Sequence, residues 1–192
     1  MKEVWVFRHG PKERGQDVIA PEVGLTPEGI ELMKKVVQMF LKKERFKKIY
    51  TSPFVRCYQS GVILALYLEL DFPIILPELA SDNLIELKKF SRDPSFFNVL
   101  QLTSDFWERR GKIVFEGIRR IAQNLSSGEK AIAVGHGELI KPALGIVLAR
   151  KEGKSFKEVL LHIPDLKEGE GIVFVFSDNN KFLGYEEKRF PT

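Results

Sequence analysis

Residues 3–10 read Glu-Val-Trp-Val-Phe-Arg-His-Gly, so that an apolar run leads directly into an arginine, a histidine and a glycine. A second strand-like run, 130–134, leads in the same way into Gly135-His136-Gly137. Short apolar runs bounded by glycine are typical of buried strands. The sequence therefore predicts two buried strands, each of which delivers a histidine at its end.

Helix-like and strand-like segments alternate between these two runs. Thr26-Pro27-Glu28 predicts a helix start, because it combines a capping residue, a proline at the first helical position and an early acidic residue. Residues 48–51 are typical of a strand, and residues 54–69 are typical of a helix. Residues 72–76 predict a short strand at a sheet edge, since they include a proline, which cannot donate to a ladder.

The second half of the chain continues this alternation. An amphipathic helix ends at Ser126-Ser127-Gly128, another helix is expected over 138–149, and a hairpin of residues 171–176 and 182–185 follows. Strands that alternate with helices predict an α/β fold of three layers, α/β/α, with a mostly parallel central sheet and helices on both faces. The amphipathic helix is marked by apolar residues at helical spacing: Val114, Ile118, Ile121 and Leu125.

The length favours one domain. A chain of 192 residues can bury one sizeable core but is short for two, so we expect a single domain over 1–192. Residues 79–110 lack clean periodicity and are expected to form a small lid insertion. In open α/β sheets, ligands collect at the carboxyl ends of the strands. This rule places four residues at one edge of the sheet: Arg8, His9, Ser52 and His136.

The amino-acid composition narrows the cellular compartment and the classes of partner that we expect. Hydrophobic residues make up 44% of the chain and charged residues 29%, as in soluble globular proteins, and the net charge is only +4. Lysine and glutamate are interleaved, which favours solvated faces over nucleic-acid or membrane binding. The sequence shows no signal-peptide core, and the single cysteine, Cys57, fits a reducing compartment, so the cytoplasm is expected. Cys57 is interpreted as a packed small side chain, because Ile63 stands where a cysteine phosphatase needs arginine.

The strand-end residues have the chemistry for phosphoryl transfer. An uncharged imidazole is a good nucleophile towards phosphorus, since its ordinary pKa of about 6.5 leaves a free lone pair near neutral pH. Attack gives a phosphohistidine and splits one difficult hydrolysis into two displacements. The planar fork of arginine matches phosphate oxygens, and Arg8 and Arg56 are the candidates. Gly10 lets the backbone approach closely behind the nucleophile.

Four motifs, in this order, resemble the histidine phosphatase superfamily, the phosphoglycerate mutase-like family. The resemblance spans about residues 3–150, and four ordered matches are far more specific than an isolated Arg-His-Gly triplet. The matching residues are Arg8-His9-Gly10, Leu25-Thr26-Pro27-Glu28-Gly29, Ser52-Pro53-Phe54-Val55-Arg56 with Gln59, and Gly135-His136-Gly137.

The resemblance implies that His9 is the phosphorylated nucleophile. It also implies that Arg8, Arg56 and His136 bind the phosphoryl oxygens, with His136 supplying positive charge or a hydrogen bond, and that Gly137 belongs to the substrate-binding set. No cofactor is expected. The three histidines of the chain also lack metal-ligand spacing, so no metal site is expected.

The resemblance further implies a carboxylic acid that protonates the leaving alkoxide. Leu76-Pro77-Glu78-Leu79 matches the start of the family's segment for this acid, which makes Glu78 the first candidate. The glycine-containing continuation is missing, however, so Asp82 and Glu86 stay open. Glu138 is a weaker candidate, because its place in the first turn of a helix explains its charge.

A second departure from the family pattern lies in the loop after Gly10. The threonine or serine that many members carry two residues beyond the glycine is replaced by Lys12. Either Lys12 or Arg14 contacts an acidic substrate, or the loop is simply solvated.

The resemblance favours a metal-independent phosphatase that acts on a small phosphorylated substrate. The alternatives are a cofactor-dependent phosphoglycerate mutase, for which the expected lid is short, and a weakly catalytic phospho-ligand-binding protein. The sequence leaves open the substrate and the oligomeric state, of which a homodimer is one option.

Overall fold

A six-stranded sheet forms the centre of the computed structural model, which describes residues 1–13, 21–80 and 104–191. The strand order is β3-β2-β4-β1-β5-β6. Neighbours from β3 to β1 are parallel, whereas β5 runs antiparallel to β1 and β6 antiparallel to β5. The strands are β1 (Lys2–Arg8), β2 (Lys48–Thr51), β3 (Ile74–Ile75), β4 (Lys130–Gly135), β5 (Gly171–Phe176) and β6 (Phe182–Lys188). The mostly parallel sheet is confirmed, and so is the edge position of the short strand that follows Pro73.

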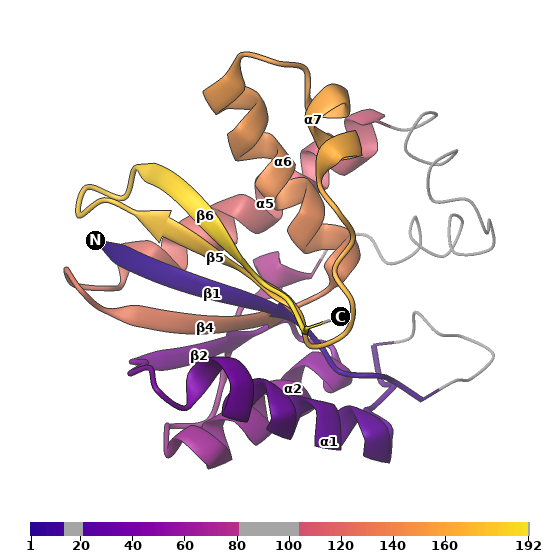
Figure 1. Ribbon diagram of the computed structural model, residues 1–192. Coiled ribbons are helices and arrows are strands. Elements are labelled where there is room, and N and C mark those ends of the chain that lie inside the picture. The colour runs from indigo at the N-terminus through magenta and orange to yellow at the C-terminus, as the bar shows by residue number, and fades with distance from the viewer. Residues whose placement is uncertain (14–20, 81–103, 192) are drawn as a thin grey trace.

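Helices cover both faces of this sheet, which confirms the α/β class (Figure 1). Helices α1 (Pro27–Val36), which continues into a π-helical turn (Val37–Leu41), and α2 (Val55–Leu68) pack on one face. Helices α5 (Ser104–Gln123) and α6 (Gly137–Glu152) pack on the other. Helix α7 (Phe156–His162) follows α6 on that second side.

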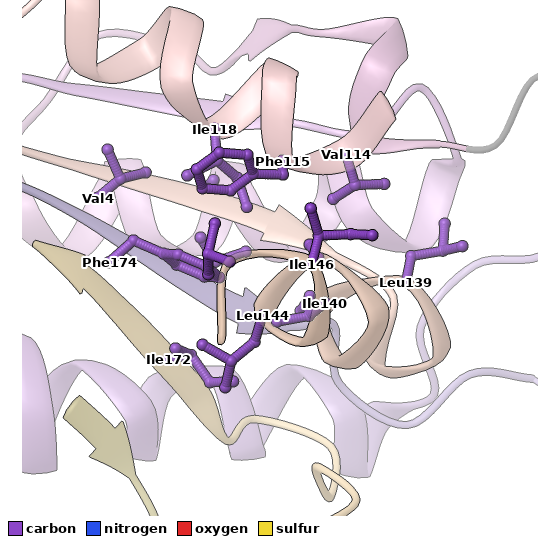
Figure 2. Packing of buried hydrophobic residues seen from close by; sticks show 14 of the residues in the cluster. Val4, Val114, Phe115, Ile118, Leu139, Ile140, Leu144, Ile146, Ile172 and Phe174 are labelled. Carbon is purple, nitrogen blue, oxygen red and sulfur yellow. The ribbon is translucent and has the colours of Figure 1, made fainter. Parts of the chain in front are cut away.

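Alternation along the strands divides the core in two. On β1, Val4 and Val6 contact the α5 and α6 side, whereas Trp5 and Phe7 belong to the cluster under α1 and α2. Figure 2 shows side chains of the first cluster, where residues of α5, such as Phe115, meet residues of the sheet, such as Phe174. Because successive side chains of a strand point to opposite faces, a fully apolar strand buries both faces at once.

The last part of the expected lid over 79–110 is helical. Residues 104–110 form the first turns of α5, and Trp107, which is 2% exposed, belongs to the core. The rest of the expected lid, which includes Asp82 and Glu86, lies outside the described residues, as does Arg14. None of the helices in the described ranges is long and apolar enough to cross a membrane.

The start of α1 is docked on the loop that follows His9. The Thr26 hydroxyl caps α1 by accepting from Gly29 N at 3.1 Å, and Thr26 N donates to Pro11 O at 3.0 Å. A Cβ on Gly29 would overlap the Pro11 carbonyl oxygen, and one on Gly10 would lie 2.7 Å from Gly29 O. Glycine at both positions therefore allows backbone-to-backbone contact directly behind the candidate nucleophile.

Candidate active site

The carboxyl ends of three parallel strands bring the predicted site residues together. His9 directly follows β1, His136 directly follows β4, and Ser52 directly follows β2. His9 N donates to Gly135 O at 3.1 Å, and the ring centroids of the two histidines are 5.3 Å apart. The predicted meeting of both histidines at one sheet edge is thus observed.

The hydrogen bonds of His9 define its tautomer. Nδ1 lies 2.7 Å from Gly10 O, and since a carbonyl oxygen only accepts, Nδ1 carries the proton. The lone pair is therefore on Nε2, where it accepts from Arg56 Nε at 3.3 Å. This arrangement presents Nε2 as the nucleophilic atom beside an arginine that can bind phosphoryl oxygens.

His9 is uncharged at neutral pH. The residue is 3% exposed, and this burial lowers its pKa from 6.5 to about 3. The hydrogen bond to Gly10 raises the pKa in part, while the positive charges of Arg56, Arg8 and Lys12 lower it further. A neutral imidazole keeps its lone pair, so the surroundings favour nucleophilic attack.

The lowered pKa predicts a loss of stability in acid. An unfolded histidine protonates near pH 6.5, whereas folded His9 protonates near pH 3, so its contribution to stability is complete above pH 6.5 and lost as pH falls. At pH 5 the loss from His9 alone is about 2 kcal/mol. Urea unfolding at pH 7.5 and pH 5 measures it, and His9→Asn should show a smaller drop between the two pH values. An equal drop in both proteins would contradict the assigned pKa.

Arg56 enters the site from the first turn of α2. Its guanidinium lies 4.5 Å above the centroid of the Phe54 ring, and the His136 ring also packs against that ring, at 4.6 Å between centroids. Ser60, one turn further along α2, donates to Arg56 O at 2.8 Å and accepts from Gly10 N at 3.3 Å. Helix α2 thus positions Arg56 and also holds the loop after His9.

Arg8 lies across the start of α6. A Cβ on Gly137 would come within 2.8 Å of Arg8 Cδ and 3.3 Å of Arg8 Nε, so glycine leaves room for this side chain. The outer nitrogens contact the segment before β5: Nη1 donates to Leu166 O at 2.6 Å, and Nη2 pairs with Glu168 at 3.2 Å. Arg8 Nε is buried without a hydrogen-bond partner among the described residues. This N–H lies beside the N-terminus of α6, a position that favours negative charge.

His136 is the second imidazole of the cluster and the residue that precedes α6. Its Nε2 lies 3.1 Å from Ser52 Oγ and 3.5 Å from Cys57 Sγ. Burial is the main reason why the pKa of His136 lies well below its ordinary value, and the surrounding charges, including that of Arg56, lower it further. His136 was expected to supply either positive charge or a hydrogen bond to the phosphoryl group, and its surroundings favour the hydrogen bond. Burial also raises the pKa of the Cys57 thiol to about 12, so this packed side chain is a poor nucleophile.

The structure does not join Glu78 to this cluster by a contact. Glu78 lies in a 3₁₀ helix, Pro77–Leu79, and its carboxylate pairs with Arg120 of α5. The second carboxylate oxygen is buried and has no hydrogen-bond partner among the described residues. The role of Glu78 as the acid therefore stays a prediction, beside those of Asp82 and Glu86.

Lys12 lies close to the cluster. It is half-buried, and burial lowers its pKa, with further contributions from the charges of Arg56 and Arg8. The carboxylates of Glu138 and Glu168 act in the opposite direction. Lys12 therefore lies among the charges of the site and not in a loop remote from them. Glu168 was not predicted from the sequence, because it belongs to no motif in the segment before β5.

Within the described ranges, no three histidine, cysteine or acidic side chains gather so that they could hold a metal ion.

A family model matches the first part of the chain. Residues 4–88 match the family model of the histidine phosphatase superfamily, branch 1, and over these residues, which include three of the four motifs, the match confirms the predicted resemblance. Among curated proteins, none matches the chain in sequence.

Solved structures extend the similarity over the whole fold. A phosphoserine phosphatase from Entamoeba histolytica, in complex with 3-phosphoglyceric acid, has a TM-score of 0.65 at 17% identity, covering 99% of this chain and 98% of that one. A mycobacterial glucosyl-3-phosphoglycerate phosphatase gives 0.62 at 15% identity, with 98% and 97% covered. An alpha-ribazole phosphatase from Shigella flexneri gives 0.59 at 16% identity, with 91% of each chain covered. At these identities the likeness establishes the shared fold.

Proposed function

We propose that this chain is a phosphatase that hydrolyses phosphomonoesters through a phosphohistidine at His9. The observation that carries the proposal is the buried, neutral imidazole of His9, whose Nδ1 is fixed by Gly10 O at 2.7 Å while Nε2 faces Arg56. The match of residues 4–88 to the histidine phosphatase superfamily supports it, as do neighbours of the same fold that are named phosphatases.

Binding of the ester phosphate uses the cations around His9. Arg8 offers its buried Nε, Arg56 stands beside the nucleophile, and Lys12 lies within reach of their charges. His136 and the N-terminus of α6 next to Gly137 supply hydrogen-bond donors. Since phosphoryl transfer relies on positioning and electrostatic stabilisation, this set serves both needs.

The reaction then proceeds in two displacements. Nε2 of His9 forms a bond to phosphorus as the bond between phosphorus and the ester oxygen breaks, and the leaving alkoxide takes a proton from a carboxylic acid. Glu78, Asp82 and Glu86 are the candidates for that acid. A water molecule next attacks the phosphohistidine, loses a proton to the same carboxylate and releases inorganic phosphate, which restores the neutral imidazole. No metal or cofactor takes part in the proposed steps.

Trapping the phosphoenzyme tests this proposal. Rapid mixing with a ³²P-labelled phosphate ester, followed by quenching in base, should leave label on the protein that is stable in base and lost in acid, as a phosphoramidate bond requires. Peptide mapping should place the label on His9. Steady turnover without any labelled protein, or label on another residue, would contradict the mechanism. Phosphate exchange that needs a bisphosphoglycerate primer would instead indicate the mutase.

A further inference from the structure

One cation of the site is already paired with a carboxylate. Arg8 Nη2 lies 3.2 Å from Glu168 Oε1, and the Glu168 side chain is 40% exposed. The remaining contacts of Arg8 leave its buried Nε towards the start of α6. Because the guanidinium is a single planar group, a phosphoryl oxygen bound at Nε would share one cation with the Glu168 carboxylate bound at Nη2.

The backbone holds Glu168 in this place. Gly169 N donates to Arg8 O at 3.1 Å, and Arg8 N donates to Glu170 O at 2.9 Å, so the segment runs alongside the end of β1. The Glu170 carboxylate accepts from Arg189 Nη1 at 2.7 Å and from Lys167 N at 2.9 Å. The backbone directly after Glu168 is therefore hydrogen-bonded to the end of β1, which places this residue beside Arg8.

A second carboxylate, that of Glu138, belongs to the surroundings of the same cations. Glu138 is exposed in the first turn of α6, next to Gly137, over which Arg8 lies. The pKa of Lys12 responds to both Glu138 and Glu168, which places this ammonium within range of the two carboxylates. When Arg8 and Arg56 compensate a phosphoryl dianion, the two carboxylates remain close to these cations and would repel any further negative charge on the bound ester.

We propose that Glu168 selects substrates by the charge of the leaving group. It disfavours esters whose leaving group carries a carboxylate or a second phosphate, and it favours those whose leaving group is neutral or cationic. The inference rests on the proposed function, because it assumes that the ester phosphate binds between Arg8 and His9. It extends that function by assigning a substrate class.

Binding of two esters of similar size tests the selection without any need for turnover. Titration calorimetry on the His9→Ala variant would compare glycerol 3-phosphate with 3-phosphoglycerate, in which a carboxylate replaces the hydroxymethyl group. Glycerol 3-phosphate should bind more tightly, and adding Glu168→Gln should raise the relative affinity for 3-phosphoglycerate by about three- to tenfold at low salt. Salt should reduce this gain, because the Debye length shortens. Glu31→Gln, which removes a carboxylate that pairs with Lys34 on α1, should leave the ratio unchanged.

The outcomes separate this inference from the function on which it rests. If both esters bind and Glu168→Gln leaves their affinity ratio unchanged, charge selection is wrong although the phosphate site stands. If the two affinities change by the same factor, Glu168 only positions Arg8, and the inference is again overturned. If neither ester binds to either variant, the proposed phosphate site itself is contradicted, and the selection with it.

Discussion

Replacing His9 with asparagine should lower the turnover of 4-nitrophenyl phosphate by roughly four orders of magnitude or more, because no other described group offers a lone pair in its place. The side-chain amide of the variant can still donate to the Gly10 carbonyl, so the local fold has a partner for that group. The melting temperature should change little near neutral pH, since the imidazole that is removed is uncharged there and asparagine keeps a partner for the Gly10 carbonyl. Steady-state kinetics and a thermal melt of the same sample measure both effects.

His162→Asn is the matched control for this substitution. His162 lies on α7 and is exposed, and its Nδ1 contacts Glu158 O at 2.7 Å, which resembles the contact of His9 with a backbone carbonyl. Turnover in this variant should stay within about twofold of the parent protein, as expected for a surface change. Comparable losses in both variants would show that the His9 effect is structural. Undiminished turnover in His9→Asn would remove His9 from the mechanism.

The elements that the sequence predicted well are those whose signals are local. The apolar run before Arg8, the cap at Thr26 and the proline after Phe72 each act over a few residues, and the structure has the corresponding strand, helix start and edge strand. Helix α7 was not predicted, although Ser155 and Glu158 form a capping box that marks its start.

Some features of the site could likewise be predicted from the sequence and others could not. The convergence of His9 and His136 follows from a general rule about parallel sheets, so it could be predicted from two strand ends. The partner of Arg8 could not, because Glu168 meets it only through the return of the chain into β5. A local match to a motif suggested that Glu78 is the proton donor. Its ion pair with Arg120 could not be predicted from that match, because it depends on how α5 packs beside the 3₁₀ helix.

Gly29→Ala should cost about 2–3 kcal/mol of stability, by forcing apart the start of α1 and the loop after His9. The added methyl group would overlap the Pro11 carbonyl oxygen, and backbone on both sides leaves no flexible side chain to give way. The cost has to exceed the gain of nearly 1 kcal/mol that alanine brings to a helix interior. Because Pro11 directly follows the Gly10 carbonyl that fixes Nδ1 of His9, turnover should fall about tenfold or more even where the variant is fully folded.

Gly184→Ala provides the comparison for this last prediction. Gly184 lies in β6, where a Cβ would meet nothing within 4 Å, so its replacement should change the free energy of unfolding by less than about 0.5 kcal/mol. Urea unfolding of both variants, with kinetics of each below its transition, separates stability from positioning. If Gly29→Ala were as stable and as active as Gly184→Ala, the backbone contact between Gly29 and Pro11 would not be what positions His9. The presence of glycine at position 29 would then need another explanation. The expected loss of stability and turnover would instead show that the Thr26-Pro27-Glu28-Gly29 motif supports the nucleophile through one backbone contact.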